Sequence, residues 1–257
     1  MTDTTMAAPP PSLRVGEVLN RAFALLSGDL VKFLALAAIA LSPLILLALL
    51  GLAAAHVTTA GSASVGMLAG FGGVGILLFV LWMVLSVLGQ AAALYGAVQK
   101  MRSQDFSVGE SLARGWARFF PILGMVLLQT LGIVFASIFF VIPGLMFLTT
   151  WYVALPACVI ERLGPAASLG RSNDLTKGNR WRVFGIIAAV YIANAIVQNV
   201  IKYGLPAIIG SIVSTIAILL WMTIFQAFNA IVVAVVYHDL RVAREGIDID
   251  RIAAVFD

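Results

Sequence analysis

The chain has few charged residues and a single cysteine. Only 11% of its 257 residues are Asp, Glu, Lys or Arg, against roughly 25% in soluble domains, whereas 61% are hydrophobic. With Cys158 alone, neither an intramolecular disulfide nor a cysteine-rich metal site can form. The mean hydropathy of +1.04 excludes an ordinary soluble domain and predicts that most of the chain lies in a lipid bilayer.

Recognisable catalytic motifs are also missing. The sequence has no phosphate-cradling glycine loop, no nucleophile elbow and no H-E-x-x-H zinc motif. The two histidines, His56 and His238, are expected on opposite sides of the membrane and so cannot share a site. We expect a protein that is not an enzyme and that holds no metal and no cofactor. Because the net charge of +4 is spread along membrane-proximal positions, we also expect no nucleic-acid binding.

Apolar segments of the length that crosses a bilayer, about 20 residues, occur six times. The glycine-rich segment 56–75 is predicted to be a loop outside the membrane, or one that re-enters it. Short turns are predicted at Pro143–Gly144 and at 202–210, and a kink at Pro156. The predicted spans are residues 33–55, 76–98, 119–141, a fourth that passes through Trp151 and ends at Ile160, 183–201 and 211–236.

Short amphipathic segments precede the pairs of spans. Residues 15–26 place apolar side chains on one helical face, with Glu17 and Arg21 spaced to pair on the other. Residues 107–119 repeat the pattern V-G-E-x-L-x-R and begin with the S-x-x-E pattern of a capping box. A weaker third copy ends at Arg171.

These patterns predict an all-α fold, a polytopic membrane helical bundle of six transmembrane helices. It would be built as three units, each an interfacial amphipathic helix followed by a transmembrane hairpin, at about 15–100, 106–161 and 165–240. The single membrane domain would cover residues 15–240, between a disordered tail, 1–14, and a cytoplasmic tail, 241–257.

The charge distribution predicts the orientation in the membrane. Fifteen of the sixteen Lys and Arg residues lie in the N-terminal segment, the linkers 100–118 and 161–182, or the C-terminal tail, and only Lys202 lies opposite. Cytoplasmic loops carry an excess of such residues. We therefore expect both termini in the cytoplasm.

The linker 161–182 is the strongest candidate for a binding surface. Its excess of positive charge could hold anionic lipid head groups, because each basic residue near such a surface contributes about 1 kcal/mol. Ordinary topology-setting charge is the alternative interpretation. The candidate lipid or partner contacts are Arg171, Lys177, Arg180, Trp181 and Arg182.

Uncharged polar residues inside the predicted spans form a second candidate set. Asn194 and Gln198 share one helical face, as do Gln226 and Asn229. They either join helices through hydrogen bonds worth about 0.6 kcal/mol each or line a conduit. The set comprises Gln90, Gln129, Asn194, Gln198, Gln226 and Asn229.

The second half of the chain carries a family resemblance. Its residues include Trp151, Glu161, Leu175-Thr176-Lys177-Gly178, Trp181-Arg182 and Asp239-Leu240-Arg241. With these the chain resembles the membrane domain attached to some bacterial glycerophosphoryl diester phosphodiesterases, over nearly its whole length. The resemblance implies that a separate barrel domain carries out the hydrolysis in that family. This chain has no room for such a domain. The resemblance implies a protein of the bacterial cytoplasmic (inner) membrane and identifies no catalytic residue.

Two hypotheses follow. The first is a non-enzymatic integral inner-membrane protein that binds lipids, mainly anionic head groups, and acts as an accessory or scaffolding subunit. Its partners would be other membrane proteins or further copies of itself. The alternative is a transporter or exporter that passes a lipid-like or apolar small molecule through the helical bundle.

Overall fold

A computed structural model of the chain describes residues 14–59, 65–139, 141–206 and 210–245, and within these ranges it contains helices and no strand. The all-α class is confirmed. The helices are α1 (Val15–Gly28), α2 (Leu30–Thr59), α3 (Val65–Met101), α4 (Val108–Ala117), α5 (Phe119–Phe139), α6 (Val141–Thr150), α7 (Ala154–Ile160), α8 (Pro165–Thr176), α9 (Arg180–Asn199), the π-helical turn η1 (Val200–Gly204) and α11 (Ser211–Glu245).

Six segments of the described chain are long and apolar enough to cross a bilayer, as predicted. They are Leu30–Leu50, Gly72–Met101, Phe119–Ile138, Ile142–Ile160, Arg180–Gly204 and Val213–Glu245. Many large apolar side chains in these segments are exposed, which suits contact with lipid. The arrangement is compatible with an integral, multi-pass membrane protein.

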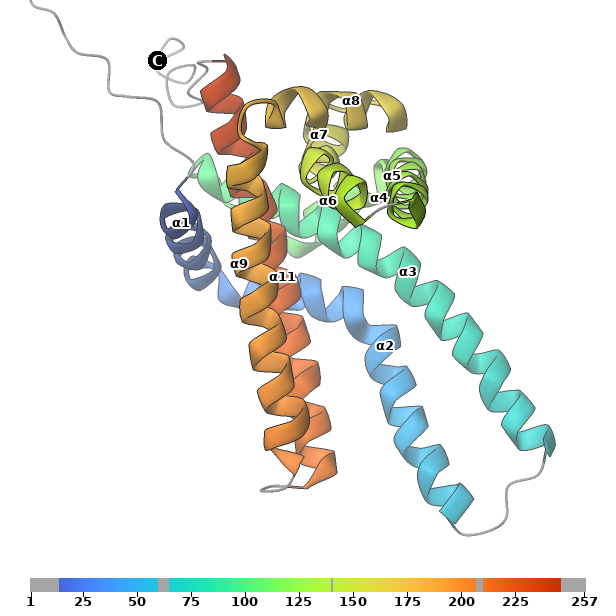
Figure 1. The fold of residues 1–257 in the computed structure, drawn as a ribbon. Helices are drawn as coiled ribbons and strands as arrows, with labels where there is room; N and C mark the ends of the chain where they lie inside the picture. Colours follow the sequence, from blue (N-terminus) through green and yellow to red (C-terminus); the bar gives the residue numbers. More distant parts are fainter. Residues whose placement is uncertain (1–13, 60–64, 140, 207–209, 246–257) are drawn as a thin grey trace, which may run out of the picture.

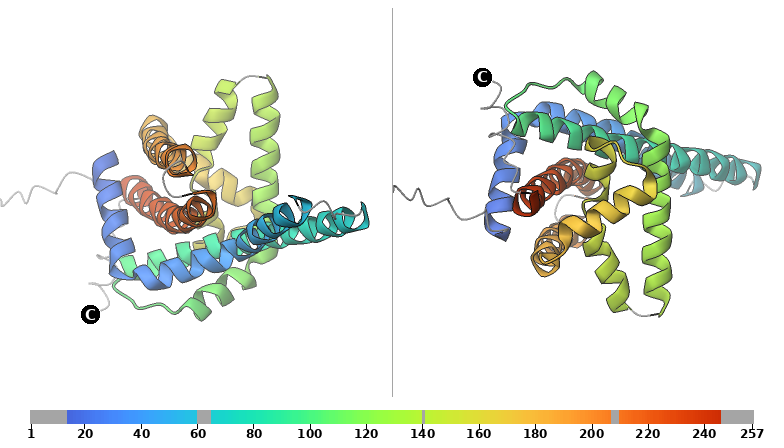
Figure 2. Two further views of the ribbon diagram at one scale, coloured as in Figure 1. Left: turned by 90° about the horizontal axis from the view of Figure 1, so that it is seen from below. Right: turned by 90° about the horizontal axis from the view of Figure 1, so that it is seen from above.

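The helices form hairpins that run in different directions (Figure 1). α2 and α3 make one hairpin, and α9 and α11 make another. α5 and α6 are seen nearly end-on in Figure 1 but along their length in Figure 2, so this hairpin runs across α9 and α11. The ten residues of α6 reach only about 15 Å, half the thickness of the hydrocarbon core.

One end of the molecule gathers α1, α4 and α8 with the C-terminal ends of α3, α7 and α11 (Figure 1). Most of the described charged side chains lie on these elements or in the segments next to them, and we call this region the charged end. Ser107 accepts a hydrogen bond from the backbone N–H of Glu110 at 3.1 Å, which is one half of the predicted capping box at the start of α4, whereas the Glu110 carboxylate accepts from Tyr95.

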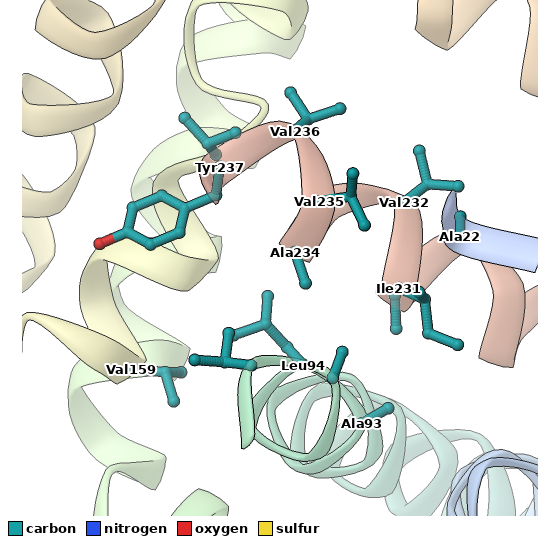
Figure 3. Close-up of a cluster of buried hydrophobic side chains, with 14 of the residues drawn as sticks. Ala22, Ala93, Leu94, Val159, Ile231, Val232, Ala234, Val235, Val236 and Tyr237 are labelled. Atoms are coloured by element: carbon teal, nitrogen blue, oxygen red, sulfur yellow. The ribbon is translucent and has the colours of Figure 1, made fainter. Parts of the chain in front are cut away.

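The hydrophobic core lies next to the charged end. Figure 3 shows Ala234 and Ile231 of α11 facing Leu94 and Ala93 of α3, with Ala22 of α1 and Val159 of α7 at the sides of the cluster. Further along the hairpins, large apolar residues are exposed instead. The core thus joins the helices at one end and leaves large apolar side chains exposed on the distal parts of the hairpins.

Small residues let α2 and α3 approach closely. Gly89 of α3 faces α2, where an added Cβ would lie 3.3 Å from the carbonyl oxygen of Leu36 and closer still to the Cβ of Ala40. Membrane helices pack through such small residues because lipid gives no hydrophobic drive for their association. α2 also bends along its length (Figure 1), and Pro43 inside it removes one backbone hydrogen bond.

The predicted loop at 56–75 is wrong. α2 continues to Thr59 and α3 begins at Val65, and residues 60–64 lie outside the described part. Glycine weakens a helix in water because it leaves the backbone exposed and free to move. In an apolar surrounding an unpaired backbone group costs several kcal/mol, so the glycines between Val65 and Gly75 remain helical.

The turn predicted at Pro143–Gly144 is also wrong, and the kink predicted at Pro156 lies three to five residues earlier. Pro143 lies in the first turn of α6, and Pro156 in the first turn of α7. The first turn of a helix has no partner for its N–H groups, so proline is tolerated there. The fourth span breaks instead at 151–153, between α6 and α7.

Two further boundaries differ from the prediction. Helical structure continues through Lys202 to Gly204, inside the predicted turn at 202–210, whereas residues 207–209 lie outside the described part. α11 extends beyond Val236 to Glu245, so its last charged residues lie beyond the apolar stretch. The predicted disordered residues 1–13 and the tail residues 246–257 are not described.

Candidate functional site

Arg171 joins three elements of the charged end. Its Nε donates to both carboxylate oxygens of Glu161, at 3.0 and 2.8 Å, and its Nη2 donates to Glu245 at the end of α11. Tyr237 donates its hydroxyl to Glu161 at 2.7 Å, and Arg241 donates to Glu245 at 2.8 Å. The structure thus places the predicted lipid contact Arg171 inside a network that ties α8 to the ends of α7 and α11.

A second set of ion pairs ties α1 and α2 to the same end. Arg21, expected to pair with Glu17 along α1, reaches Asp239 of α11 at 2.6 Å. Asp29 accepts from Lys100 of α3 at 2.5 Å and from Lys32 at 3.1 Å. The hydrogen bond from Lys100 lowers the pKa of Asp29; burial opposes it, and Lys32 lowers the pKa further. These pairs hold the helices together and are not free to bind a ligand.

Most of the remaining cations fall into two groups, which have no carboxylate within 4 Å among the described residues. One group is Lys177, Arg180 and Arg182, just after α8 and in the first turn of α9. The other is Arg102, Arg118 and Arg162, at helix ends that are far apart in the sequence. Uncompensated positive charge is therefore concentrated at two places.

The first group borders an apolar groove. The segment 177–182, which we call the basic turn, lies beside a cavity of about 350 Å³ between α6 and α9, which we call the α6–α9 groove. Arg180 donates to Asn173 at 2.6 Å, while the Trp181 side chain is 85% exposed. Arg182 donates to Asn179 at 3.1 Å. The groove is lined by Ile142, Leu145, Met146, Thr149, Arg180, Trp181 and Phe184.

The second group lines a cavity of about 560 Å³ between the C-terminal end of α3, α4 and the end of α7, which we call the arginine cavity. Arg118 donates to the carbonyl oxygens of Cys158 and Leu163 at 3.2 and 2.9 Å. These hydrogen bonds cap the C-terminal end of α7. Arg114 lies over the Tyr95 ring at 5.7 Å. The cavity is lined by Tyr95, Val98, Gln99, Arg102, Gln104, Arg114, Ala117, Arg118, Val159, Ile160 and Arg162.

Two of the predicted intramembrane polar residues, Gln90 and Gln129, line one cavity. It measures about 420 Å³ and lies between α3 and α5, with Ser86 and Thr130 also in its wall. Gln129 donates to the carbonyl oxygen of Trp151 at 3.4 Å, where the chain breaks between α6 and α7. These residues thus sit at the joint between the first two hairpins.

The other four lie on α9 and α11. Asn194 accepts from Gln198 at 3.2 Å and from the indole of Trp221 at 2.9 Å, which joins the two helices. Asn229 lies beside Tyr191, and Gln226 is half-buried on α11. The six predicted residues therefore occupy two separate places and do not follow a single path.

Comparison of the chain with models of protein families, with curated proteins and with solved structures finds no match. Among the described residues, no group of three or more His, Cys, Asp or Glu is placed to hold a metal ion. The candidate sites are therefore supported only by the geometry of the described residues.

The arginine cavity was not predicted from the sequence. Its arginines come from two linkers, 100–118 and 161–182, whose basic character is visible in the sequence. That they meet depends on how α7 packs against α3 and how α4 leads into α5. The only available signal was that both linkers are basic and are expected on the same face of the membrane.

Proposed function

We propose that this chain is a non-enzymatic integral protein of a bacterial inner membrane that binds anionic lipid and serves as an accessory or scaffolding subunit. The observation that carries this proposal is the α6–α9 groove with the basic turn at its rim. Its apolar walls suit an acyl chain, and the uncompensated Lys177 and Arg182 suit a negatively charged head group. The exposed Trp181 is a residue type enriched at the membrane interface.

The resemblance to the membrane domain of some bacterial phosphodiesterases supports the proposed place in a bacterial inner membrane. The positions of α1, α4 and α8, one before each hairpin, support the repeated design of three units. The α3–α5 cavity favours the transport alternative. Because the other polar residues lie between α9 and α11, lipid binding is the better supported function.

Removing the two free cations of the basic turn, Lys177→Gln with Arg182→Gln, should weaken the binding of phosphatidylglycerol about 30-fold. Each cation contributes about 1 kcal/mol to the attraction. The measurement is native mass spectrometry of the protein in mild detergent titrated with the lipid. Both side chains are exposed, so the fold should survive.

The matched control removes two other exposed cations of the charged end, Arg14→Gln with Arg244→Gln, and should retain the lipid. Equal loss in both double variants would show that the lipid responds to net charge alone. A parent protein that retains no lipid would contradict the proposed function.

We further propose that the charged end faces the cytoplasm and that both termini lie there, supported by the distribution of the basic residues. A reporter fused at Ser64 should then read as outside and one fused at Asp105 as inside. A phosphatase and a fluorescent protein, active on opposite sides of the membrane, provide the measurement. The opposite pattern would overturn the orientation.

A further inference from the structure

We propose that the arginine cavity is a second binding site, for the dianionic phosphate of a phosphate monoester. This site is separate from the α6–α9 groove and does not rest on the lipid function proposed there. Four arginines face a space of about 560 Å³, and they come from three different parts of the fold. Guanidinium groups match phosphate oxygens with paired N–H donors, which makes arginine the preferred residue for such groups.

A simpler explanation is that these arginines only neutralise helix ends. Arg102 follows the last residue of α3, Arg162 follows α7, and Arg118 donates to carbonyl oxygens at the end of α7. The C-terminal end of a helix carries roughly half a negative charge, so α3 and α7 together supply about one. That is too little to balance four guanidinium groups.

Among the described residues, Glu110 is the carboxylate that bonds to side chains of this cluster, because the neighbouring Asp105 and Glu161 pair with Lys32 and Arg171 instead. Glu110 accepts from the Tyr95 hydroxyl at 3.1 Å and lies 3.8 Å from Arg114. With Glu110 and the two helix ends counted, about two positive charges remain uncompensated. A phosphate monoester carries about −1.5 to −2 charges at pH 7, whereas a phosphodiester carries only one. The charge of the cavity therefore fits the monoester.

The lining also divides into fixed and free arginines. Arg118 is held by two carbonyl oxygens, and its Nε is buried with no hydrogen-bond partner in the described chain. Arg114 is held by Glu110 and the Tyr95 ring. Arg102 and Arg162 are exposed and have no ion pair with a described residue, so they are the two free to close on a ligand. Arg162 has a φ of 55°, an unusual conformation for a residue other than glycine.

A phosphate monoester can reach this cavity from two sources, a soluble metabolite or the head group of a lipid such as phosphatidic acid. The cavity contains apolar Val98, Val159 and Ile160 beside the arginines, which is compatible with either. The experiment therefore has two arms, one for each source.

In the first arm, inorganic phosphate is added to the full chain in detergent at pH 7.5, and thermal unfolding is compared with chloride at equal ionic strength. Phosphate should raise the melting temperature by about 5–11 °C once it exceeds its dissociation constant a hundredfold. Arg102→Gln with Arg162→Gln should weaken phosphate binding at least tenfold. Lys177→Gln with Arg182→Gln removes the same charge elsewhere and should leave phosphate binding unchanged.

In the second arm, the protein is reconstituted in nanodiscs of phosphatidylcholine with a minor share of phosphatidic acid, and the lipids retained on extraction are counted. Enrichment of phosphatidic acid that disappears in Arg102→Gln with Arg162→Gln identifies the lipid source. Phosphate binding without such enrichment identifies a soluble ligand. The proposal is overturned if phosphate stabilises the protein no more than chloride does, or if both double variants lose phosphate equally.

Discussion

Replacing Arg171 with alanine should lower the stability of the protein by about 2 kcal/mol, or roughly 4–8 °C in melting temperature. The side chain is 26% exposed and bonds two carboxylates, which are 16% and 19% exposed. Without it, Glu161 and Glu245 would face each other half-buried, with only Tyr237 and Arg241 to hold them. The cost lies mainly in these stranded carboxylates, and less in the loss of the pair itself. Thermal unfolding in detergent, followed by tryptophan fluorescence, measures it.

Two companion variants separate this effect from a general loss of charge. Arg171→Lys keeps the charge but loses the forked donor, so it should lie between the parent and Arg171→Ala. Arg182→Ala removes an exposed arginine and should leave the melting temperature almost unchanged. If Arg171→Ala and Arg182→Ala unfold at the same temperature, the network does not stabilise the charged end.

The smallest possible change at Gly89, to alanine, should separate α2 from α3 and cost about 1–3 kcal/mol. The added methyl group would meet the Cβ of Ala40 and the carbonyl oxygen of Leu36, neither of which can rotate away. The helices must then move apart along a contact that is otherwise closely packed. The expected result is a lower melting temperature and faster proteolysis of the α2–α3 hairpin.

Gly72 provides the matched control in the same helix. A Cβ built at Gly72 meets nothing within 4 Å, so Gly72→Ala should be neutral or should stabilise α3 by up to about 1 kcal/mol. Opposite signs for one substitution at two positions would show that close approach, and not helix propensity, decides the result at Gly89. Equal effects of the two substitutions would refute the close α2–α3 contact.

The six apolar spans and the all-α class followed from the sequence, because an apolar run of some 20 residues has few alternatives to a helix in a membrane. Helix boundaries were harder to predict where glycine and proline occur. The glycines from Gly66 to Gly75 suggested a loop, and Pro143 suggested a turn, yet both lie in helices. In an apolar surrounding, the free-energy cost of unpaired backbone groups outweighs the preference of glycine and proline for turns.

The candidate sites were predictable only in part. Lys177, Trp181 and Arg182 are exposed, and Trp181 lines an apolar groove, whereas the role of all three in binding stays a prediction. Arg171 comes from the same linker, but it is committed to Glu161 and Glu245. Pairing between residues 74 positions apart depends on the tertiary fold, which no local pattern reveals.

The single thiol gives this molecule a built-in chemical reporter. Cys158 is fully buried in α7. Its backbone carbonyl accepts a hydrogen bond from Arg118, which lines the arginine cavity. A thiol reagent can modify it only when this region opens, so the rate of labelling measures local opening in the parent chain without any engineered probe. An anion held by the arginines should slow that rate, and loss of Arg171 should raise it.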